Sequence, residues 1–237
     1  MESKTELWKE DESVSQTTNI FQDVEIPENL ELNHAYLVSK ALKRPFDFLF
    51  ALCTIIIISP ILIGCAIAIK VTSRGPVLFT QERYGKDNKL FKIYKFRTMY
   101  CSMQDTSGVI QTTKNDTRIT PIGKFLRRTS LDELPQFLNV LNGTMSVVGP
   151  RPHVPGMLAS GMLYEELCPD YFERHKVKPG ITGLAQVKGY RGMTTDAHHA
   201  KMRLFLDRKY SQRFTLWLDV KIIIGTFFSE FILGKAD

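Results

Sequence analysis

Two neighbouring carboxylates, Asp132 and Glu133, directly follow a pair of arginines in the stretch 127–136. Apolar residues at helical spacing come after them and predict a short helix. Ser130 and Glu133 have the spacing of a capping box, although a helix that begins at Asp132 would hold Pro135 more easily in its first turn. In both registers the acids lie at the amino end of a helix, where they could complement the helix dipole or serve chemistry.

Paired carboxylates are also the catalytic groups of glycoside hydrolases. Those pairs flank the scissile bond from opposite sides of the sugar, roughly 5–9.5 Å apart. Sequence neighbours such as Asp132 and Glu133 do not easily bracket a sugar ring. Glycoside hydrolysis is therefore the weaker interpretation of this pair.

Basic residues supply the candidate phosphate ligands. Arg151 stands between two prolines, which present its guanidinium rigidly and suit it to bidentate phosphate binding. Lys95 and Arg97 belong to the segment 89–99, whose alternation predicts a strand with one side that faces either solvent or phosphate. Arg191 lies in a glycine-containing basic loop. Interleaved basic and aromatic residues can also bind single-stranded nucleic acid. The apolar segment that precedes them favours lipid head groups or a phosphorylated substrate, so no nucleic-acid partner is expected.

The element that must position these residues is a run of 22 uncharged residues, 48–69, long enough for a bilayer core of about 30 Å. Pro60 falls in its middle, where it removes a donor from the carbonyl of Ile56, and Ser59 is expected to satisfy that carbonyl. Basic residues flank both ends, as when both ends are cytoplasmic. The pattern predicts a re-entrant helix–break–helix hairpin over 41–72. A proline-kinked spanning helix and a buried core helix are the alternatives.

Charge divides the remainder of the chain. Residues 1–33 hold nine acids and two lysines, a net −7 against +6 for the whole chain, so 1–40 is expected to be a flexible acidic extension. Residues 73–237 are expected to form a cytoplasmic catalytic domain, with a polar loop at 101–120 over the site and an amphipathic helix at the membrane interface over 204–233. The fold class is thus α/β, rich in helix, in a monotopic membrane protein. The four cysteines lack metal-binding spacing and fit a reducing compartment.

Several motifs together resemble the bacterial sugar transferases, the monotopic phosphoglycosyl transferases that start capsule, exopolysaccharide or O-antigen synthesis. The resemblance covers about residues 41–237. The matching pieces are KRPFD (43–47), the Ser59-Pro60 break, GPVLFTQERYG (75–85), FKIYKFRTM (91–99), LRRTSLDELPQFLNVLNGTMSVVGPRP (126–152), VKPGITGLAQVKG (177–189) and LDRKY (206–210).

The resemblance implies a two-step reaction at the cytoplasmic face of the bacterial inner membrane. A UDP-sugar gives its sugar phosphate to an aspartate with release of UMP, and polyprenyl (undecaprenyl) phosphate then takes the sugar phosphate. By motif position Asp132 is the nucleophile, Glu133 is its partner, both hold Mg²⁺, and Arg127 and Arg151 bind the diphosphate. Repulsion between a diphosphate and a carboxylate nucleophile makes such neutralising groups necessary.

The chain departs from the family pattern after the GLAQV segment. The usual asparagine-glycine-arginine is here Lys188-Gly189-Tyr190-Arg191, and a frequent tryptophan is Leu184. The loop resembles that of members that transfer a plain hexose phosphate such as glucose or galactose, and an N-acetylated sugar is the alternative. A non-catalytic membrane-anchored scaffold is the alternative function, although the acid pair is intact. The sequence is compatible with a monomer or a homodimer.

Overall fold

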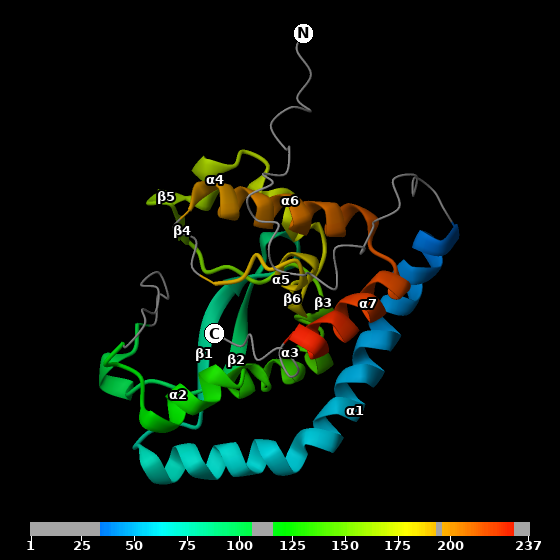
Figure 1. Ribbon diagram of the computed structural model, residues 1–237. Helices are drawn as coiled ribbons and strands as arrows, with labels where there is room; N and C mark the ends of the chain where they lie inside the picture. Colours follow the sequence, from blue (N-terminus) through cyan, green and yellow to red (C-terminus); the bar gives the residue numbers. More distant parts are fainter. Residues whose placement is uncertain (1–33, 106–115, 193–195, 230–237) are drawn as a thin grey trace.

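The computed structural model describes residues 34–105, 116–192 and 196–229 (Figure 1). Most of the expected acidic extension and half of the expected loop at 101–120 lie outside these ranges. The α-helices are α1 (His34–Thr72), α2 (Pro121–Arg128), α3 (Gln136–Asn142), α4 (Tyr164–Leu167), α5 (Leu184–Val187), α6 (Ala197–Arg213) and α7 (Leu216–Phe227). Short 3₁₀ turns are η3 (Lys86–Asn88), η4 (Cys101–Met103), η5 (Leu131–Glu133) and η6 (Tyr171–Lys176).

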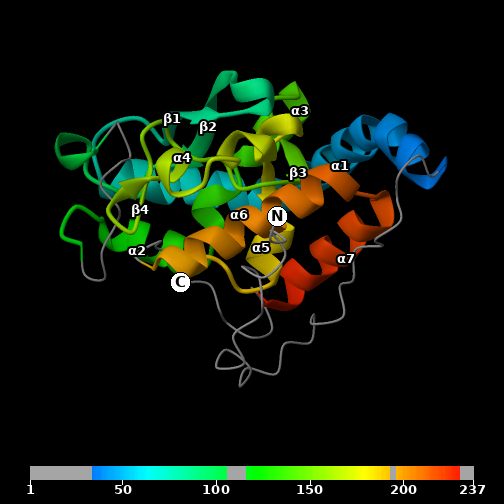
Figure 2. The ribbon, with the colours of Figure 1, turned by 90° about the horizontal axis from the view of Figure 1, so that it is seen from above.

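In the part of the chain that the structure describes, three small two-stranded sheets complete this mixed, helix-rich fold. β1 (Leu78–Tyr84) pairs antiparallel with β2 (Leu90–Phe96), which confirms the strand predicted within 89–99. β3 (Ser146–Val148) pairs parallel with β6 (Gly180–Thr182), and β4 (Leu158–Ala159) pairs antiparallel with β5 (Met162–Leu163). Figure 2 shows the β1–β2 hairpin and α6 on different sides of the molecule.

Helix α1 is one 39-residue helix with Pro45 and Pro60 inside it, and it begins earlier than the residue 41 expected for the hairpin. Figure 1 shows it changing direction along its length, as proline-containing helices do. Ser59 Oγ donates to the Ile56 carbonyl at 2.8 Å, which confirms the predicted replacement for the donor that Pro60 removes. The helix is long and apolar enough to cross a membrane, and only 11% of its most apolar window is buried. A buried core helix therefore does not fit.

Both halves of α1 pack their inner faces on the rest of the domain. In the first half, Ala51 joins the main core together with Phe137 of α3. In the second half, Ile69 joins a separate cluster with Phe96 of β2 and Leu126 of α2. The outer face remains exposed along the whole helix. Its large apolar side chains are Leu37, Val38, Leu42, Phe48, Leu49, Leu52, Ile56, Ile57, Ile61, Ile63, Ile67 and Val71.

A buried polar cluster ties α1 to the sheet. Asp47, 2% exposed, accepts hydrogen bonds from Ser146 Oγ at 2.8 Å and from Val147 N at 3.1 Å. Lys43 Nζ pairs with Asp47 Oδ1 and with Asp219 Oδ2 of α7, at 2.9 Å each. Buried charges of this kind are tolerated only when paired and hydrogen-bonded. The KRPFD segment is therefore the joint between α1, β3 and α7.

Arg44 of the same segment holds the carboxyl end of α3. Its guanidinium donates to the carbonyl oxygens of Val140 and Leu141 at 2.5 and 2.8 Å. These carbonyls belong to the last turn of α3, where the Val140 carbonyl also accepts from the N–H of the C-cap Gly143 at 3.1 Å. Because η5 directly precedes α3 in the chain, this contact also helps to position η5 relative to α1.

The amphipathic helix expected over 204–233 is divided into two helices. α6 ends at Arg213, and the chain extends through Phe214 before α7 begins. Thr215 caps α7, since its side chain accepts from Leu218 N at 3.1 Å. The outward side of α7 exposes apolar groups such as Trp217, which is 68% exposed. The residues beyond 229 lie outside the described chain.

Candidate active site

The acid pair lies on a tight turn between two helices. α2 ends at Arg128, Ser130 takes a left-handed conformation with φ of 53°, and η5 then carries both acids. The capping-box prediction is wrong, because the Ser130 side chain makes no capping bond in this conformation. Pro135 is instead the N-cap of α3, where its missing N–H breaks no helical bond. Asp132 and Glu133 thus precede α3 rather than lie in its first turn.

Two cations clamp Glu133. Lys95 Nζ lies 2.6 Å from Glu133 Oε1. The Arg151 guanidinium binds the same carboxylate in a bidentate manner, with Nη2–Oε1 at 2.7 Å and Nη1–Oε2 at 3.2 Å. Burial alone would raise the pKa of Glu133, but Arg151 and Lys95 together hold that pKa well below its usual range. The structure thus brings Lys95 and Arg151 to the acid pair, and Glu133 is firmly ionised.

Asp132 has the opposite character. Its side chain is buried, and no described residue donates a hydrogen bond to its carboxylate. Burial raises the pKa of Asp132 to about 6, with Glu133 adding to the rise and nearby cations, Lys95 first, opposing it. Neighbouring carboxylates whose environments push their pKa values apart commonly take separate roles in catalysis. Asp132 is the one with unengaged oxygens, so it is the group able to react.

Arg127 faces Asp132 from the end of α2. Its Nε donates to Thr98 Oγ1 at 2.9 Å, which fixes the direction of the guanidinium. Burial lowers the pKa of Arg127, and the charge of Asp132 opposes that effect. Arg127 therefore remains a cation beside the candidate nucleophile. Thr98, which orients it, carried no role in the sequence interpretation.

Arg97 does not contact the acid pair, although Lys95, two residues before it, does. It is 1% exposed, and its guanidinium donates to the backbone carbonyls of Ser73, Arg74 and Pro76 at 2.6–2.9 Å. These bonds tie β2 to the segment between α1 and β1. The contacts of Arg97 are thus those of a structural residue, and a role in substrate binding stays a prediction without support from them.

Arg191 lies in the turn that follows α5. The carbonyls on either side of it, those of Tyr190 and Gly192, accept hydrogen bonds from Arg203 of α6 at 2.9 Å each. The turn is therefore held by α6, and residues 193–195 after it lie outside the described chain. Binding of substrate by Arg191 stays a prediction.

Arg83 was missed by the sequence interpretation. It comes from β1, donates to the Pro152 carbonyl at 3.3 Å and bonds the side chain of Gln81. Burial lowers the pKa of Arg83 to about 10, with Arg151 contributing and Glu133 opposing, so its guanidinium belongs to the same charged cluster. The only signal in the sequence was its presence in the GPVLFTQERYG motif.

A buried ion pair positions Arg151. Arg174 Nε and Nη2 donate to Asp207 Oδ2 at 3.0 and 2.7 Å, and Nη2 also donates to the Arg151 carbonyl at 2.6 Å. Neither side chain is more than 3% exposed. The contact joins η6, α6 and the proline-flanked turn, which lie far apart in the sequence. Spacing alone could not have revealed it.

The side-chain oxygens at the acid pair are the candidate ligands for Mg²⁺. Within the described residues no cluster of three or more histidine, cysteine, aspartate or glutamate side chains could hold a metal ion. Mg²⁺ is however often held by one or two carboxylates together with substrate phosphates. The unengaged Asp132 carboxylate beside Glu133 fits such an ion when a diphosphate supplies further oxygens, and Glu133 would share its carboxylate with Lys95 and Arg151.

Comparison with known proteins relates the chain to one group. A family model described as bacterial sugar transferase matches residues 38–232. The exopolysaccharide production protein PSS of Rhizobium leguminosarum bv. phaseoli is 53% identical over 195 residues, which are 82% of this chain and 98% of that protein. The UDP-glucose:undecaprenyl-phosphate glucose-1-phosphate transferase of Klebsiella pneumoniae is 51% identical over 84% of this chain and 42% of its own length. The UDP-N-acetylgalactosamine-undecaprenyl-phosphate N-acetylgalactosaminephosphotransferase of Aeromonas hydrophila is 42% identical over 78% of this chain, again 42% of its own length. The chain thus spans about two fifths of the two named transferases.

Proposed function

The chain belongs to the bacterial sugar transferase family, and on that premise we propose that it transfers a sugar 1-phosphate from a UDP-sugar to undecaprenyl phosphate and releases UMP. This reaction would be the first step of exopolysaccharide synthesis, in keeping with the names of its relatives. The observation that carries the proposal is the difference between the two acids. Glu133 is ion-paired and has a lowered pKa, whereas buried Asp132 has a raised pKa.

In the first step an Asp132 carboxylate oxygen attacks the β-phosphorus of the donor. The bond from that phosphorus to the bridging oxygen breaks, and UMP leaves with the bridging oxygen and its electron pair. With a pKa of about 6, Asp132 is mostly ionised at pH 7, so no separate base is needed. The product is an acyl-phosphate that carries the sugar.

In the second step a phosphate oxygen of the lipid acceptor attacks the same phosphorus. The bond between phosphorus and the Asp132 oxygen breaks, which restores the carboxylate and gives the polyprenyl-diphosphate sugar. Both steps place new negative charge on phosphate oxygens, and preorganised cations stabilise such charge most effectively. Lys95, Arg127 and Arg151 are the cations held around the acids.

Arg151 has a geometry suited to the diphosphate. Its guanidinium can bind a phosphate in the same bidentate manner as the Glu133 carboxylate. Its side chain is 36% exposed and therefore accessible to a substrate. Mg²⁺, held by Asp132 and Glu133 with the diphosphate, would supply further neutralisation of phosphate charge. Glu133 orders the cations and the metal in this scheme, while Asp132 reacts.

We also propose that α1 is re-entrant, with both ends on the cytoplasmic face of the inner membrane. The support is its packing, since Ala51 and Ile69, in opposite halves of the helix, both contact the same domain. A straight helix that crossed the bilayer would carry one of these halves away from that domain. The exposed apolar outer face and the bonded break at Ser59 fit burial in lipid.

Glucose is the sugar we propose for the donor, because the relative named for UDP-glucose is 51% identical and the one named for an N-acetylated sugar 42%. The test is a panel of UDP-sugars incubated with undecaprenyl phosphate and the full chain in lipid nanodiscs. UMP release should be greatest with UDP-glucose and should coincide with a lipid-diphosphate-glucose product by mass spectrometry. Release of no UMP from any donor, with Mg²⁺ present, would support the non-catalytic scaffold instead.

A further inference from the structure

Two cationic side chains, from Arg44 of α1 and from Lys178 between η6 and β6, lie together beside Gly143 at the carboxyl end of α3. Arg44 Nη2 and Lys178 Nζ are 3.3 and 3.6 Å from the point where a Cβ would stand on this glycine. The two lengths together put the nitrogens at most about 7 Å apart. Gly143 has a φ of 85°, a conformation that disfavours a side chain, so none of its own atoms fills the space between the cations.

Lys178 has no anionic partner in the described part of the chain. Its side chain is half-buried, and none of the described residues forms a hydrogen bond or an ion pair with its Nζ. Burial lowers its pKa, and the charges of Arg44, Lys86 and Lys43 lower it further. Asp47 opposes this lowering, but its carboxylate already accepts from Lys43 and from β3. The cluster therefore has an excess of positive charge.

Arg44 keeps hydrogen-bond donors for a ligand. A guanidinium has five N–H groups, and the bonds of Arg44 to the two carbonyls of α3 use two of them. The Arg44 guanidinium carbon lies 5.6 Å from the centre of the Phe48 ring, where the uncharged run of α1 begins. Phe48 and Leu49 are 41% and 59% exposed. The two cations thus border the exposed apolar face of α1.

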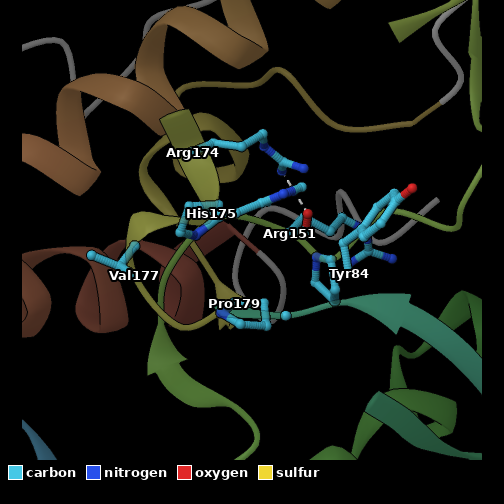
Figure 3. Close-up of a pocket in the computed structure, with 9 residues that line it drawn as sticks. Tyr84, Arg151, Arg174, His175, Val177 and Pro179 are labelled. Atoms are coloured by element: carbon cyan, nitrogen blue, oxygen red, sulfur yellow. Dashed lines mark hydrogen bonds between the residues drawn. The ribbon is translucent and has the colours of Figure 1, made fainter. Parts of the chain in front are cut away.

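The backbone that carries Lys178 is fixed. Val177 and Pro179, which flank it in the chain, lie near the turn of Arg151 (Figure 3). The Pro179 carbonyl accepts from Ser146 N of β3 at 2.8 Å. A lysine on a fixed backbone loses less conformational freedom when it binds a ligand than one on a mobile loop.

We propose that Arg44 and Lys178 bind the phosphate of an anionic phospholipid such as phosphatidylglycerol, with its acyl chains along the face of α1 that begins at Phe48. Two charge-assisted hydrogen bonds of about 2.8 Å to different oxygens of one phosphate bridge cations at this separation. Basic side chains at the ends of membrane helices favour anionic head groups. The inference requires α1 to lie in lipid, but it depends neither on the re-entrant topology nor on the transfer reaction.

The acceptor of the proposed reaction is also a lipid phosphate, but the cluster is badly placed to hold it during transfer. α3 has seven residues and is therefore about 10 Å long. The cluster lies at its carboxyl end, whereas Asp132 precedes its amino end. A phosphate at the cluster would lie about one α3 length or more from the reacting carboxylate, too far for attack. A resident phospholipid suits this position better than a substrate.

The test titrates the full chain in a neutral detergent with dioctanoyl phosphatidylglycerol and counts bound lipid by native mass spectrometry. One phosphatidylglycerol should bind to wild type, and Lys178→Gln should bind it about fivefold more weakly, the effect of one basic residue near an anionic lipid. Lys178→Arg keeps the charge and should bind nearly as wild type. Lys176→Gln removes an exposed lysine that is paired with Glu173, and as the matched control it should bind as wild type.

Two further ligands distinguish the sources of phosphate. Dioctanoyl phosphatidylcholine has the same phosphate without a net charge and should bind wild type more weakly than phosphatidylglycerol does. Inorganic phosphate lacks acyl chains and should not displace phosphatidylglycerol at equal concentration. Equal binding of the two lipids, displacement by inorganic phosphate, or equal affinity of wild type and Lys178→Gln for phosphatidylglycerol would each overturn the proposal. If Lys178→Gln does not fold, the comparison of the two lipids on wild type decides.

Thermal unfolding without anionic lipid separates ligand binding from a purely structural role. Because the pKa of Lys178 is lowered by folding, its charge opposes folding below that pKa, and Lys178→Gln should be at least as stable as wild type at pH 7. A lysine that only complemented the carboxyl end of α3 would stabilise the fold instead. A lower melting temperature of Lys178→Gln together with unchanged lipid binding would assign Lys178 to that structural role and overturn the lipid site.

Discussion

Replacing Asp132 with asparagine should make the protein more stable while abolishing its activity. Burial raises the pKa of Asp132 to about 6, so the folded state disfavours the charge that this residue carries at neutral pH. The shift from an unfolded value near 3.9 is about 2 pKa units, which corresponds to about 3 kcal/mol at 1.36 kcal/mol per unit. Asparagine has a similar shape and no charge. It removes that destabilisation.

The sign depends on pH. A group whose pKa is raised by folding stabilises the fold below its unfolded pKa and loses that contribution as pH rises through the folded value. Asp132→Asn and wild type should therefore have similar stability near pH 4, diverge as pH rises from about 4 to 6, and keep a constant difference above pH 6. At about 2–4 °C per kcal/mol, the melting temperature of the variant at pH 8 should be roughly 6–12 °C higher.

The neighbouring acid provides a control of opposite sign. The pKa of Glu133 is held well below its usual range, so its ionised form stabilises the fold above the unfolded pKa. Glu133→Gln should therefore lower the melting temperature at pH 8, because Lys95 and Arg151 then face no charge. The difference from wild type should shrink as pH falls toward the depressed pKa.

The assay is thermal unfolding of the three proteins in identical nanodiscs with EDTA, at intervals from pH 4 to pH 8, so that the carboxylates are compared without metal. Opposite shifts from two adjacent residues cannot come from a general effect of mutation. If Asp132→Asn is destabilising across the whole range, burial does not set the pKa of Asp132, and our division of the acid pair is wrong.

Other predictions concern rate, binding and topology. The pH profile of kcat/KM should fall about tenfold per unit below pH 6, as Asp132 becomes protonated, and a flat profile down to pH 5 would contradict its role. Arg151→Lys should reduce kcat/KM for the donor by about 10- to 100-fold, because lysine cannot form a bidentate contact with phosphate. Arg128→Lys, at an exposed neighbour of Arg127, should have no effect on kcat/KM. Single cysteines at positions 40 and 74 of a cysteine-free chain should both be inaccessible to reagent outside intact cells, and labelling of either one would refute the re-entrant topology. Pro60→Ala should lower activity more than stability by straightening α1.

Local patterns in the sequence predicted the elements that depend on local physics. Alternation within 89–99 predicted β2, and the position of Ser59 before Pro60 predicted the bond to the Ile56 carbonyl. Both follow from backbone rules that act over a few residues. The apolar run predicted a helix–break–helix hairpin over 41–72, whereas α1 begins at His34 and continues through Pro60 as one helix.

Contacts between distant segments could not be predicted in the same way. Arg97 and Lys95 lie two residues apart on one strand, yet one holds backbone carbonyls and the other holds Glu133. The pair of Arg174 and Asp207 that supports Arg151 depends on how η6 and α6 pack. The turn at Ser130 was missed because serine rarely takes a left-handed conformation, which the surrounding packing must impose.

The most direct measurement is intact-protein mass spectrometry of the chain after incubation with donor and Mg²⁺ but without lipid acceptor. If Asp132 is the nucleophile, one UMP is released per active site and the peptide that contains Asp132 gains a sugar phosphate, and both are absent in Asp132→Asn. Undecaprenyl phosphate should then remove the adduct. No UMP before acceptor is added, together with no adduct at any time, would mean that the lipid phosphate attacks the donor directly and would contradict Asp132 as the nucleophile.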